Sequence, residues 1–279
     1  MLDRITVVTD ALDHPEGIAW SPSGAIYAGG EAGQLYRVSM DGDVSLVGTT
    51  EGFAYGVTLD ADDREFVCDF ARAELVRVDA DGTVTPITNG TSDRPMQIPN
   101  FSAFDEDGTL YVTDSGAWGG AAGVIYAVSP DGMTVVWTDV VADFPNGCCL
   151  TADGSGLLVV ESRARRVAHV AIGPDGRAGS VTTVATFVGS QPDGLALAAD
   201  GETLLVGCYR PDRIYVATLA GATDVIADDP DGVILNQPTN VAFVGDDLAT
   251  LAISSLGGWT ISTVDAGLAG LPLRRPTLT

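Results

Sequence analysis

Residues 145–176 read PNGCCLTADGSGLLVVESRARRVAHVAIGPDG. This stretch opens with Pro-Asn-Gly, continues as an apolar run, turns at Asp-Gly, and then holds two further apolar runs separated by a polar loop. Short apolar runs bounded by Gly, Pro, Asn and Asp are typical of β-strands joined by tight turns. The stretch therefore predicts three consecutive antiparallel strands. Asn is a poor strand former and Gly weakens pairing, so either turn formation or a chemical role must explain the Pro-Asn-Gly opening.

The same unit occurs six times along the chain. Its copies begin at Pro15, Ala54, Pro99, Pro145, Pro192 and Pro238, so successive starts lie 39, 45, 46, 47 and 46 residues apart. After each of the first five copies comes one more short β-rich piece: VSLVG, VTPIT, TVVWT, VTTVA or TDVIA. A period of about 40–50 residues with four strands is typical of a β-propeller blade. The sequence therefore predicts an all-β, six-bladed β-propeller with four antiparallel strands in each blade.

The last copy has only three strands before the tail LPLRRPTLT at residues 271–279. We expect the N-terminal segment ITVVT, residues 5–9, to supply the missing outer strand, so that both ends of the chain close one blade. Closure removes most of the exposed strand edges, which would otherwise promote aggregation. No linker-like segment interrupts the repeats, and we expect a single domain over residues 1–279.

Composition excludes several functions. The formal charge is −24, and all 14 basic residues are Arg. A chain with this much negative charge repels phosphate backbones, which argues against a nucleic-acid partner. The lack of Lys excludes Schiff-base chemistry and a P-loop. The only histidines, His14 and His169, cannot form a three-histidine zinc site. With neither a membrane-spanning apolar stretch nor an export signal in view, we expect a cytoplasmic protein with free thiols and no membrane partner.

The middle residues of the repeated turns form a pattern of their own. In a propeller the first strand of each blade lines the central channel, so the residues that open these strands form a ring at one mouth. Aligned on the copies, the ring reads Glu16, Tyr55, Asn100, Asn146, Asp193 and Thr239. A set of carboxylate and amide oxygens without Cys or His suits Ca²⁺ before Mg²⁺ or Mn²⁺. Turn chemistry alone would explain Pro and Gly, but it explains Glu16 poorly.

The ordered turns Pro-Glu-Gly, Pro-Asn, Pro-Asn-Gly and Pro-Asp-Gly, in copies one, three, four and five, resemble those of the senescence marker protein, gluconolactonase and luciferin-regenerating enzyme family. Cys208-Tyr209 and Asp114-Ser115 are similar to residues of its members. The resemblance spans the whole chain. It implies a Ca²⁺-dependent hydrolase, most often a lactonase, although Mg²⁺, Mn²⁺ or Zn²⁺ could replace Ca²⁺. It also implies the metal ligands Glu16, Asn146 and Asp193, with Asn100 as a ligand or substrate contact.

Such a cation would polarise the carbonyl of a lactone during attack by water. Asp193 is then the candidate catalytic base, and a metal-bound hydroxide is the alternative. The loops between second and third strands share the face of the ring, so we expect a small-molecule substrate to contact the residues Asn100, Tyr55, Ile98, Asp114, Trp118 and Tyr209. Sugar-lactone members of the family resemble one another in an Arg where this chain has Ile98, which favours a less polar lactone or ester.

Two other functions stay open on the sequence. Strictosidine-synthase-like propellers resemble this chain in blade plan and in their Pro-Asn-Gly turns, and some of them catalyse condensation without a metal. A ligand-binding propeller without catalytic activity is the other alternative, because one fold hosts many functions. The sequence leaves the oligomeric state open.

Overall fold

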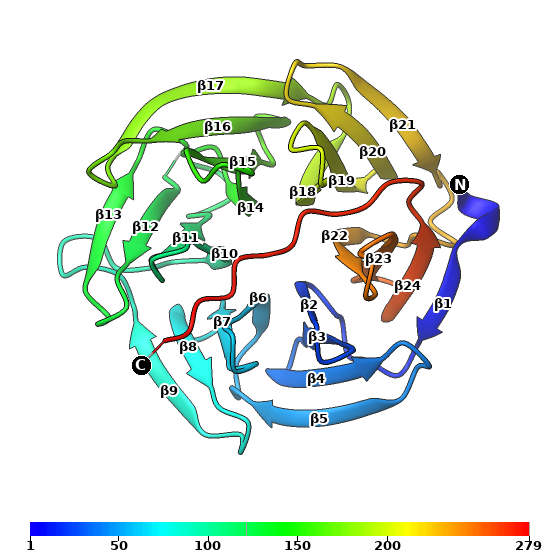
Figure 1. Cartoon of the computed structure of the whole chain (residues 1–279), viewed down its shortest axis with the longest axis horizontal. Helices are drawn as coiled ribbons and strands as arrows, with labels where there is room; N and C mark the ends of the chain where they lie inside the picture. The colour runs from blue at the N-terminus through cyan, green and yellow to red at the C-terminus, as the bar shows by residue number, and fades with distance from the viewer. Residues whose placement is uncertain (121, 279) are drawn as a thin grey trace.

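The computed structural model describes residues 1–120 and 122–278, which form six four-stranded antiparallel sheets around one axis (Figure 1). From inner to outer strand, the first three blades are β2 (Ile18–Ser21), β3 (Ala25–Gly29), β4 (Gln34–Ser39) and β5 (Val44–Thr49); β6 (Ala54–Leu59), β7 (Glu65–Asp69), β8 (Glu74–Val78) and β9 (Val84–Thr88); and β10 (Pro99–Phe104), β11 (Leu110–Asp114), β12 (Val124–Val128) and β13 (Thr134–Thr138).

The other three blades are β14 (Pro145–Leu150), β15 (Gly156–Glu161), β16 (Arg166–Ile172) and β17 (Ala178–Thr186); β18 (Gln191–Leu197), β19 (Thr203–Arg210), β20 (Asp212–Thr218) and β21 (Thr223–Asp228); and β22 (Pro238–Val244), β23 (Thr250–Ser255), β24 (Thr260–Asp265) and β1 (Thr6–Thr9). The 3₁₀ helix η1 (Leu2–Arg4) precedes β1. The prediction of an all-β, six-bladed propeller is confirmed. No helix within the described residues has the length and apolar character that crossing a membrane requires.

The sixth blade closes as the sequence predicts. Its outer strand is β1, which pairs antiparallel with β24 and places Thr6 opposite Thr263. Each inner strand contacts the inner strands of both neighbouring blades, in the closed cycle β2, β6, β10, β14, β18, β22 and back to β2. Apolar side chains from adjacent blades fill the space between the sheets. Leu158 and Val160 of β15, for example, pack in one cluster with Leu204 of β19.

The glycines of the Pro-X-Gly openings have a packing role. Gly17, Gly147 and Gly194 lie outside the left-handed φ region, so turn geometry does not require them. Because the inner strands converge at the axis, a Cβ on Gly147 would lie 2.8 Å from the Asp193 carbonyl oxygen of the next blade, and a Cβ on Gly194 would lie 2.7 Å from that of Thr239. The glycines let neighbouring inner strands approach closely.

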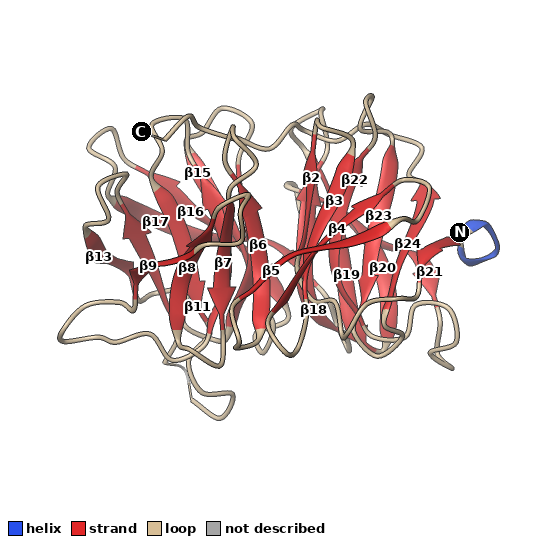
Figure 2. Ribbon diagram, turned by 90° about the horizontal axis from the view of Figure 1, so that it is seen from below, coloured by secondary structure: helices blue, strands red, loops and turns tan. Residues whose placement is uncertain are grey.

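The C-terminal segment, residues 268–278, crosses the propeller axis and is called the strap below (red in Figure 1). It follows the ends of the inner strands. Gly270 and Leu271 donate backbone hydrogen bonds to the carbonyl oxygens of Leu248 and Leu197, each at 2.9 Å. Further along, Pro276 accepts one from Ala61 at 3.1 Å. The ring residues lie at the opposite, N-terminal ends of these strands, so the strap and the ring occupy opposite faces of the disc (Figure 2).

Candidate metal centre

Four blades each contribute one oxygen-bearing side chain to the start of the inner strands. Glu16 comes just before β2, and Asn100, Asn146 and Asp193 are each the second or third residue of their strands. All four are buried, with Glu16 only 8% and Asp193 only 5% exposed. Burial of polar side chains at equivalent positions of four separate blades indicates a common site on the axis.

Hydroxyl groups hold the backbone of this ring in place. Ser254 donates to the Glu16 carbonyl oxygen at 2.6 Å, and Thr239, a member of the ring, donates to the same oxygen at 3.2 Å. Thr113 donates to the carbonyl oxygen of Asn146 at 2.8 Å, and Ser115 donates to that of Pro145 at 2.7 Å. These bonds tie the sixth blade to the first and the third blade to the fourth at the level of the ring, which limits the movement of Glu16 and Asn146.

Asn146 is also held through its side chain. Its Nδ2 donates to Ser162 Oγ at 3.2 Å, which leaves the amide oxygen without a hydrogen bond to any residue that the structure describes. An amide oxygen fixed in this way can serve as a neutral metal ligand. Ser162 and Ser254, whose hydroxyl groups support the ring, were not predicted from the sequence to be functional residues. The available signal was a Ser or Thr recurring at the end of second strands, as in TDS, ESR and ISS.

The electrostatics of the ring favour a cation. Burial raises the pKa of Glu16 to about 7, although hydrogen bonding with Thr239 offsets part of the rise. Burial and the charge of Glu16 raise the pKa of Asp193 well above its ordinary value, with Asn146 partly offsetting the rise. No Arg or His within residues 1–120 and 122–278 forms an ion pair with either carboxylate. Two buried, mutually repelling carboxylates without a counter-charge are costly, and a bound divalent cation would remove that cost.

Aromatic side chains form one wall beside the ring. Tyr55 stacks on Phe70 with ring centroids 5.1 Å apart, and Phe53 meets Tyr55 edge-on at 4.6 Å. Burial raises the pKa of Tyr209 to about 12, with the Asp193 charge adding to the rise. Asp193 and Glu16 are also among the charges that raise the pKa of Tyr55, after burial as the main cause. Both tyrosines therefore lie near the ring and keep their hydroxyl protons.

The other predicted substrate contacts are placed differently. Trp118 is 43% exposed on the loop after β11 and packs edge-on against Phe144 at 4.6 Å. Ile98 is half-buried just before β10. The buried Asp114 carboxylate accepts backbone hydrogen bonds from Gln97 at 2.6 Å, Ile98 at 2.9 Å and Gly116 at 3.0 Å. Asp114 thus anchors the segment that leads into Asn100, and its contact with substrate stays a prediction.

One polar cluster lies two residues before Glu16. His14 Nδ1 is 2.8 Å from Asp13 Oδ1 and 2.9 Å from Glu31 Oε2, and Gln34 donates to the other oxygen of Asp13 at 2.9 Å. His14 also packs against Trp259, with ring centroids 4.5 Å apart. Glu31 follows the end of β3, which is antiparallel to β2, so this cluster lies at the same end of the first blade as Glu16.

Comparison with known proteins identifies the family of the chain. The family model described as the SMP-30/Gluconolactonase/LRE-like region matches residues 31–257. A model of the strictosidine synthase-like N-terminal region matches residues 2–38 only. No curated protein matches the chain at a significant level. Because the first model spans most of the chain, the resemblance expected from the turn motifs is confirmed.

Solved structures with the same fold include three named relatives. A gluconolactonase from Xanthomonas campestris has a TM-score of 0.80 at 21% identity, covering 94% of this chain and 89% of that one. A luciferin-regenerating enzyme has a TM-score of 0.81 at 18% identity over 98% of this chain and 99% of that one. Regucalcin from Agrobacterium tumefaciens, described as a calcium-binding protein, has a TM-score of 0.78 at 17% identity over 98% and 97%. The chain belongs to the SMP-30/gluconolactonase/LRE-like family of six-bladed propellers.

Proposed function

We propose that the protein is a divalent-metal-dependent hydrolase that opens a small lactone of low polarity, with Ca²⁺ as the first candidate metal. The observation that carries the proposal is the pair of buried carboxylates, Glu16 and Asp193, without a cationic partner in the described residues. The family model and the names of the structural neighbours support lactonase chemistry.

The oxygen set of the ring fits a hard cation. Glu16 and Asp193 supply two negative charges, and the Asn146 amide oxygen, with its Nδ2 held by Ser162, supplies a neutral donor. Asn100 completes the set as a ligand or as a contact to substrate. The absence of Cys and His from the ring favours Ca²⁺, Mg²⁺ or Mn²⁺ over Zn²⁺. When bound, such an ion polarises an ester carbonyl and stabilises the negative charge that develops on its oxygen.

The side chains in and beside the ring have separate roles in the proposed reaction. Asp193 orients the attacking water, accepts its proton, and returns that proton to the ring oxygen of the lactone as the C–O bond breaks, which yields a hydroxy acid. Tyr209 lies near Asp193 and remains protonated, so its hydroxyl can donate a hydrogen bond to the substrate. Stacking of Tyr55 on Phe70 holds an apolar wall against the substrate.

The polarity of that wall supports the choice of substrate. Phe53, Tyr55 and Phe70 pack together beside the ring, and the half-buried Ile98 precedes Asn100. A polyhydroxylated lactone would leave several hydroxyl groups without partners against these side chains, which is costly. We therefore infer a lactone with few hydroxyl groups, such as a γ- or δ-alkyl lactone.

Calorimetric titration of chelator-treated protein with CaCl₂, followed by a lactone panel in a pH-stat, tests the proposal. We expect stoichiometric Ca²⁺ binding and Ca²⁺-dependent release of acid from alkyl lactones, both lost in Asp193→Asn. Asp153→Asn is the matched control, because Asp153 is an acidic turn residue on an inner-strand connection and hydrogen-bonds only locally to Ser155 and Thr151. Lack of metal binding by the intact protein would refute the metal site. Binding without any hydrolysis would favour a ligand-binding propeller.

A further inference from the structure

A cavity of about 350 Å³ lies on the axis between the ring and the strap. All six inner strands and residues 271–275 of the strap line it, but none of Glu16, Asn100, Asn146 and Asp193 does. On β2, for example, the lining begins at Ile18, two residues beyond Glu16. On β10 and β22 it begins at Phe101 and Asn240, one residue beyond Asn100 and Thr239. Since a strand advances about 3.3 Å per residue, the lining begins roughly 3–7 Å along the strands from the ring. The cavity is therefore separate from the proposed metal centre.

The wall of this cavity is mostly apolar. Trp20, Leu59, Leu150, Leu197 and Phe243 each come from a different inner strand, and all are buried. This lining resembles that of sites that bind small organic molecules, which are mostly apolar and measure about 300–1,000 Å³. A dry apolar cavity of about 150 Å³ accommodates benzene, so this one can hold a molecule of about ten non-hydrogen atoms.

One polar side chain in the wall lacks a partner. Asn240 lines the cavity and is 3% exposed, yet its carboxamide makes no hydrogen bond to another side chain or backbone group in residues 1–120 and 122–278. By contrast, the hydroxyl groups of Thr58 and Ser102 pair with each other at 2.9 Å. Because it lines the cavity without a partner in the protein, the Asn240 carboxamide provides a hydrogen-bonding position for one polar group of a ligand.

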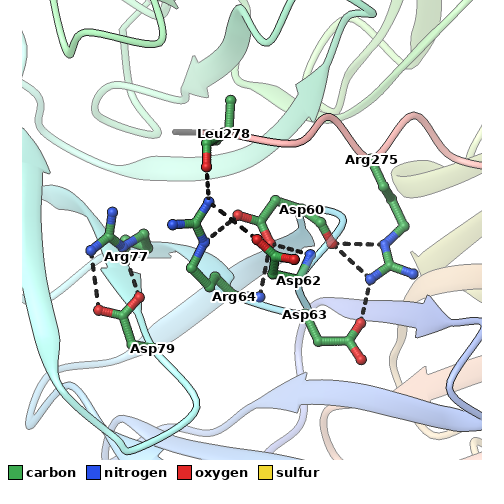
Figure 3. Close-up of polar contacts among 8 residues, drawn as sticks. All are labelled: Asp60, Asp62, Asp63, Arg64, Arg77, Asp79, Arg275 and Leu278. Carbon is green, nitrogen blue, oxygen red and sulfur yellow. Dashed lines mark hydrogen bonds and ion pairs between the residues drawn. The ribbon is translucent and has the colours of Figure 1, made fainter.

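The two cationic groups in the wall are already engaged. Arg274 donates to the carbonyl oxygens of Thr151 and Ala152, each at 3.1 Å. Arg275 donates to the Asp60 carbonyl oxygen at 2.7 Å and pairs with Asp63 (Figure 3). Both guanidinium groups are bonded to the protein, and the third charged residue of the described lining is the exposed carboxylate of Asp246, so the cavity has no free positive charge to bind an anion. Its chemistry matches an uncharged molecule.

The strap covers the mouth of the cavity and is fastened at several points. Beyond Arg274 and Arg275, Arg64 donates to the carbonyl oxygen of Leu278 at 2.7 Å (Figure 3). These contacts join side chains to turns, backbone hydrogen bonds to the blades are few, as at Gly270 and Leu271, and the strap is part of none of the six sheets. A segment held in this way can open locally at a lower free-energy cost than a blade strand, which gives a ligand a way in.

We infer that this axial cavity is a second binding site, for a small uncharged molecule that is largely hydrocarbon and carries one hydrogen-bonding oxygen, with the strap as its cover. The hydrocarbon part lies against the apolar side chains of the inner strands, and the oxygen pairs with Asn240. The site is independent of the proposed hydrolase function, because it shares none of the four candidate metal ligands.

Binding of 1-octanol to the full chain, measured by calorimetry with and without EDTA, tests the inference. We expect one saturable site whose affinity does not change when metal is removed. Ala103→Leu and Ala196→Leu enlarge two small, partly exposed side chains of the wall, and each should weaken binding at least tenfold. Asn240→Leu should lower the affinity for 1-octanol relative to heptane.

Three controls keep the result interpretable. Far-UV circular dichroism and urea denaturation of each variant show whether it is still folded. Octanoate, which carries a charge, should bind at least tenfold more weakly than 1-octanol. The absence of saturable 1-octanol binding would overturn the inference. So would binding whose affinity is the same in Ala103→Leu and Ala196→Leu as in the wild type. Neither result would affect the test of lactone hydrolysis, which measures a reaction at the ring on the opposite face of the propeller.

Discussion

The amide nitrogen of Gly17 donates a hydrogen bond to the carbonyl oxygen of Tyr55 in the next blade at 2.9 Å, and a Cβ on Gly17 would lie 2.4 Å from that oxygen. The same residue that follows a candidate metal ligand thus joins two inner strands at their closest approach. This contact lies next to Glu16. The separation of neighbouring blades therefore sets how far the oxygen atoms of the ring lie from one another.

Substitution of this glycine should destabilise the protein. In Gly17→Ala the methyl group would overlap with backbone atoms of Tyr55 and Gly56, and such overpacking costs about 1–3 kcal/mol or more. Gly119→Ala is the control, since a Cβ there meets no atom within 4 Å. Urea denaturation of the two variants should show a lower midpoint for Gly17→Ala only. Equal midpoints would mean that the inner strands move apart to accommodate the methyl group without loss of stability.

Charge burial at the ring leads to a second prediction. Burial and the charge of Glu16 raise the pKa of Asp193. Without a metal, the folded protein must therefore either keep a proton on this carboxyl or bury its charge. The stability of the metal-free protein should fall as the pH rises above the ordinary pKa of an Asp carboxyl. At pH 8, chelator-treated Asp193→Asn should therefore unfold at a higher temperature than the chelator-treated wild type. Added CaCl₂ should raise the melting temperature of the wild type and leave that of the variant unchanged.

Asp153→Asn should behave in the opposite way. Local hydrogen bonds from Ser155 and Thr151 lower the pKa of Asp153 to about 2, so its charged form is the favoured one in the fold. Loss of that charge should not stabilise the chelator-treated protein, and the response to CaCl₂ should persist. If calcium raised the melting temperature of Asp193→Asn as much as that of the wild type, the cation would bind elsewhere.

Sequence periodicity was sufficient to predict the blades because each blade repeats the same local pattern of apolar runs and turns. The outer strand of the sixth blade was also predictable, since one strand was missing at the end of the chain and ITVVT was left over at its start. The strap was not. Residues 268–278 bind through backbone carbonyl oxygens and through Arg side chains, and neither produces an apolar period in the sequence.

The ring was predictable for a similar reason: Glu16, Asn100, Asn146 and Asp193 stand at equivalent places in the repeat. The residues that support them were harder to find. Ser162 and Ser254 come from second strands and act through single hydrogen bonds across space. The cavity between the ring and the strap was also out of reach, because its lining side chains are ordinary apolar strand residues. Only the arrangement of six inner strands, together with the strap, reveals a cavity there.

Substrate polarity can be altered at Ile98. The side chain is half-buried just before Asn100, and its backbone amide is held by Asp114 at 2.9 Å, so a longer side chain can extend from a fixed backbone. In Ile98→Arg we expect kcat/KM for an aldonolactone to rise relative to that for an alkyl lactone by at least tenfold, because the guanidinium group offers partners to hydroxyl groups. Ile98→Leu is the control and should retain the wild-type preference. An unchanged preference in both variants would place the substrate away from this residue.

The last prediction concerns a buried carboxyl group far from the ring. Glu65 begins β7 and is 1% exposed, and neither of its carboxyl oxygens has a hydrogen-bond partner among the residues that the structure describes. Burial, with a further contribution from the charge of Asp63, raises its pKa from 4.5 to about 8. The folded state therefore holds a proton that the unfolded state has released between these values, so the free energy of unfolding should fall as pH rises from 4.5 to 8.

Glu65→Gln removes this titration. The variant should have a flatter dependence of stability on pH, and at pH 8.5 it should exceed the wild type by about 1–3 kcal/mol. Glu161→Gln is the matched control, because Glu161 is equally buried but pairs with Arg166 at 2.5 Å and accepts a hydrogen bond from Asp143 at 3.0 Å. Its substitution leaves Arg166 without a charged partner and should destabilise the protein at the same pH. Urea unfolding between pH 5 and pH 8.5 distinguishes the two variants, and parallel curves for Glu65→Gln and the wild type would show that Glu65 is ionised in the folded protein.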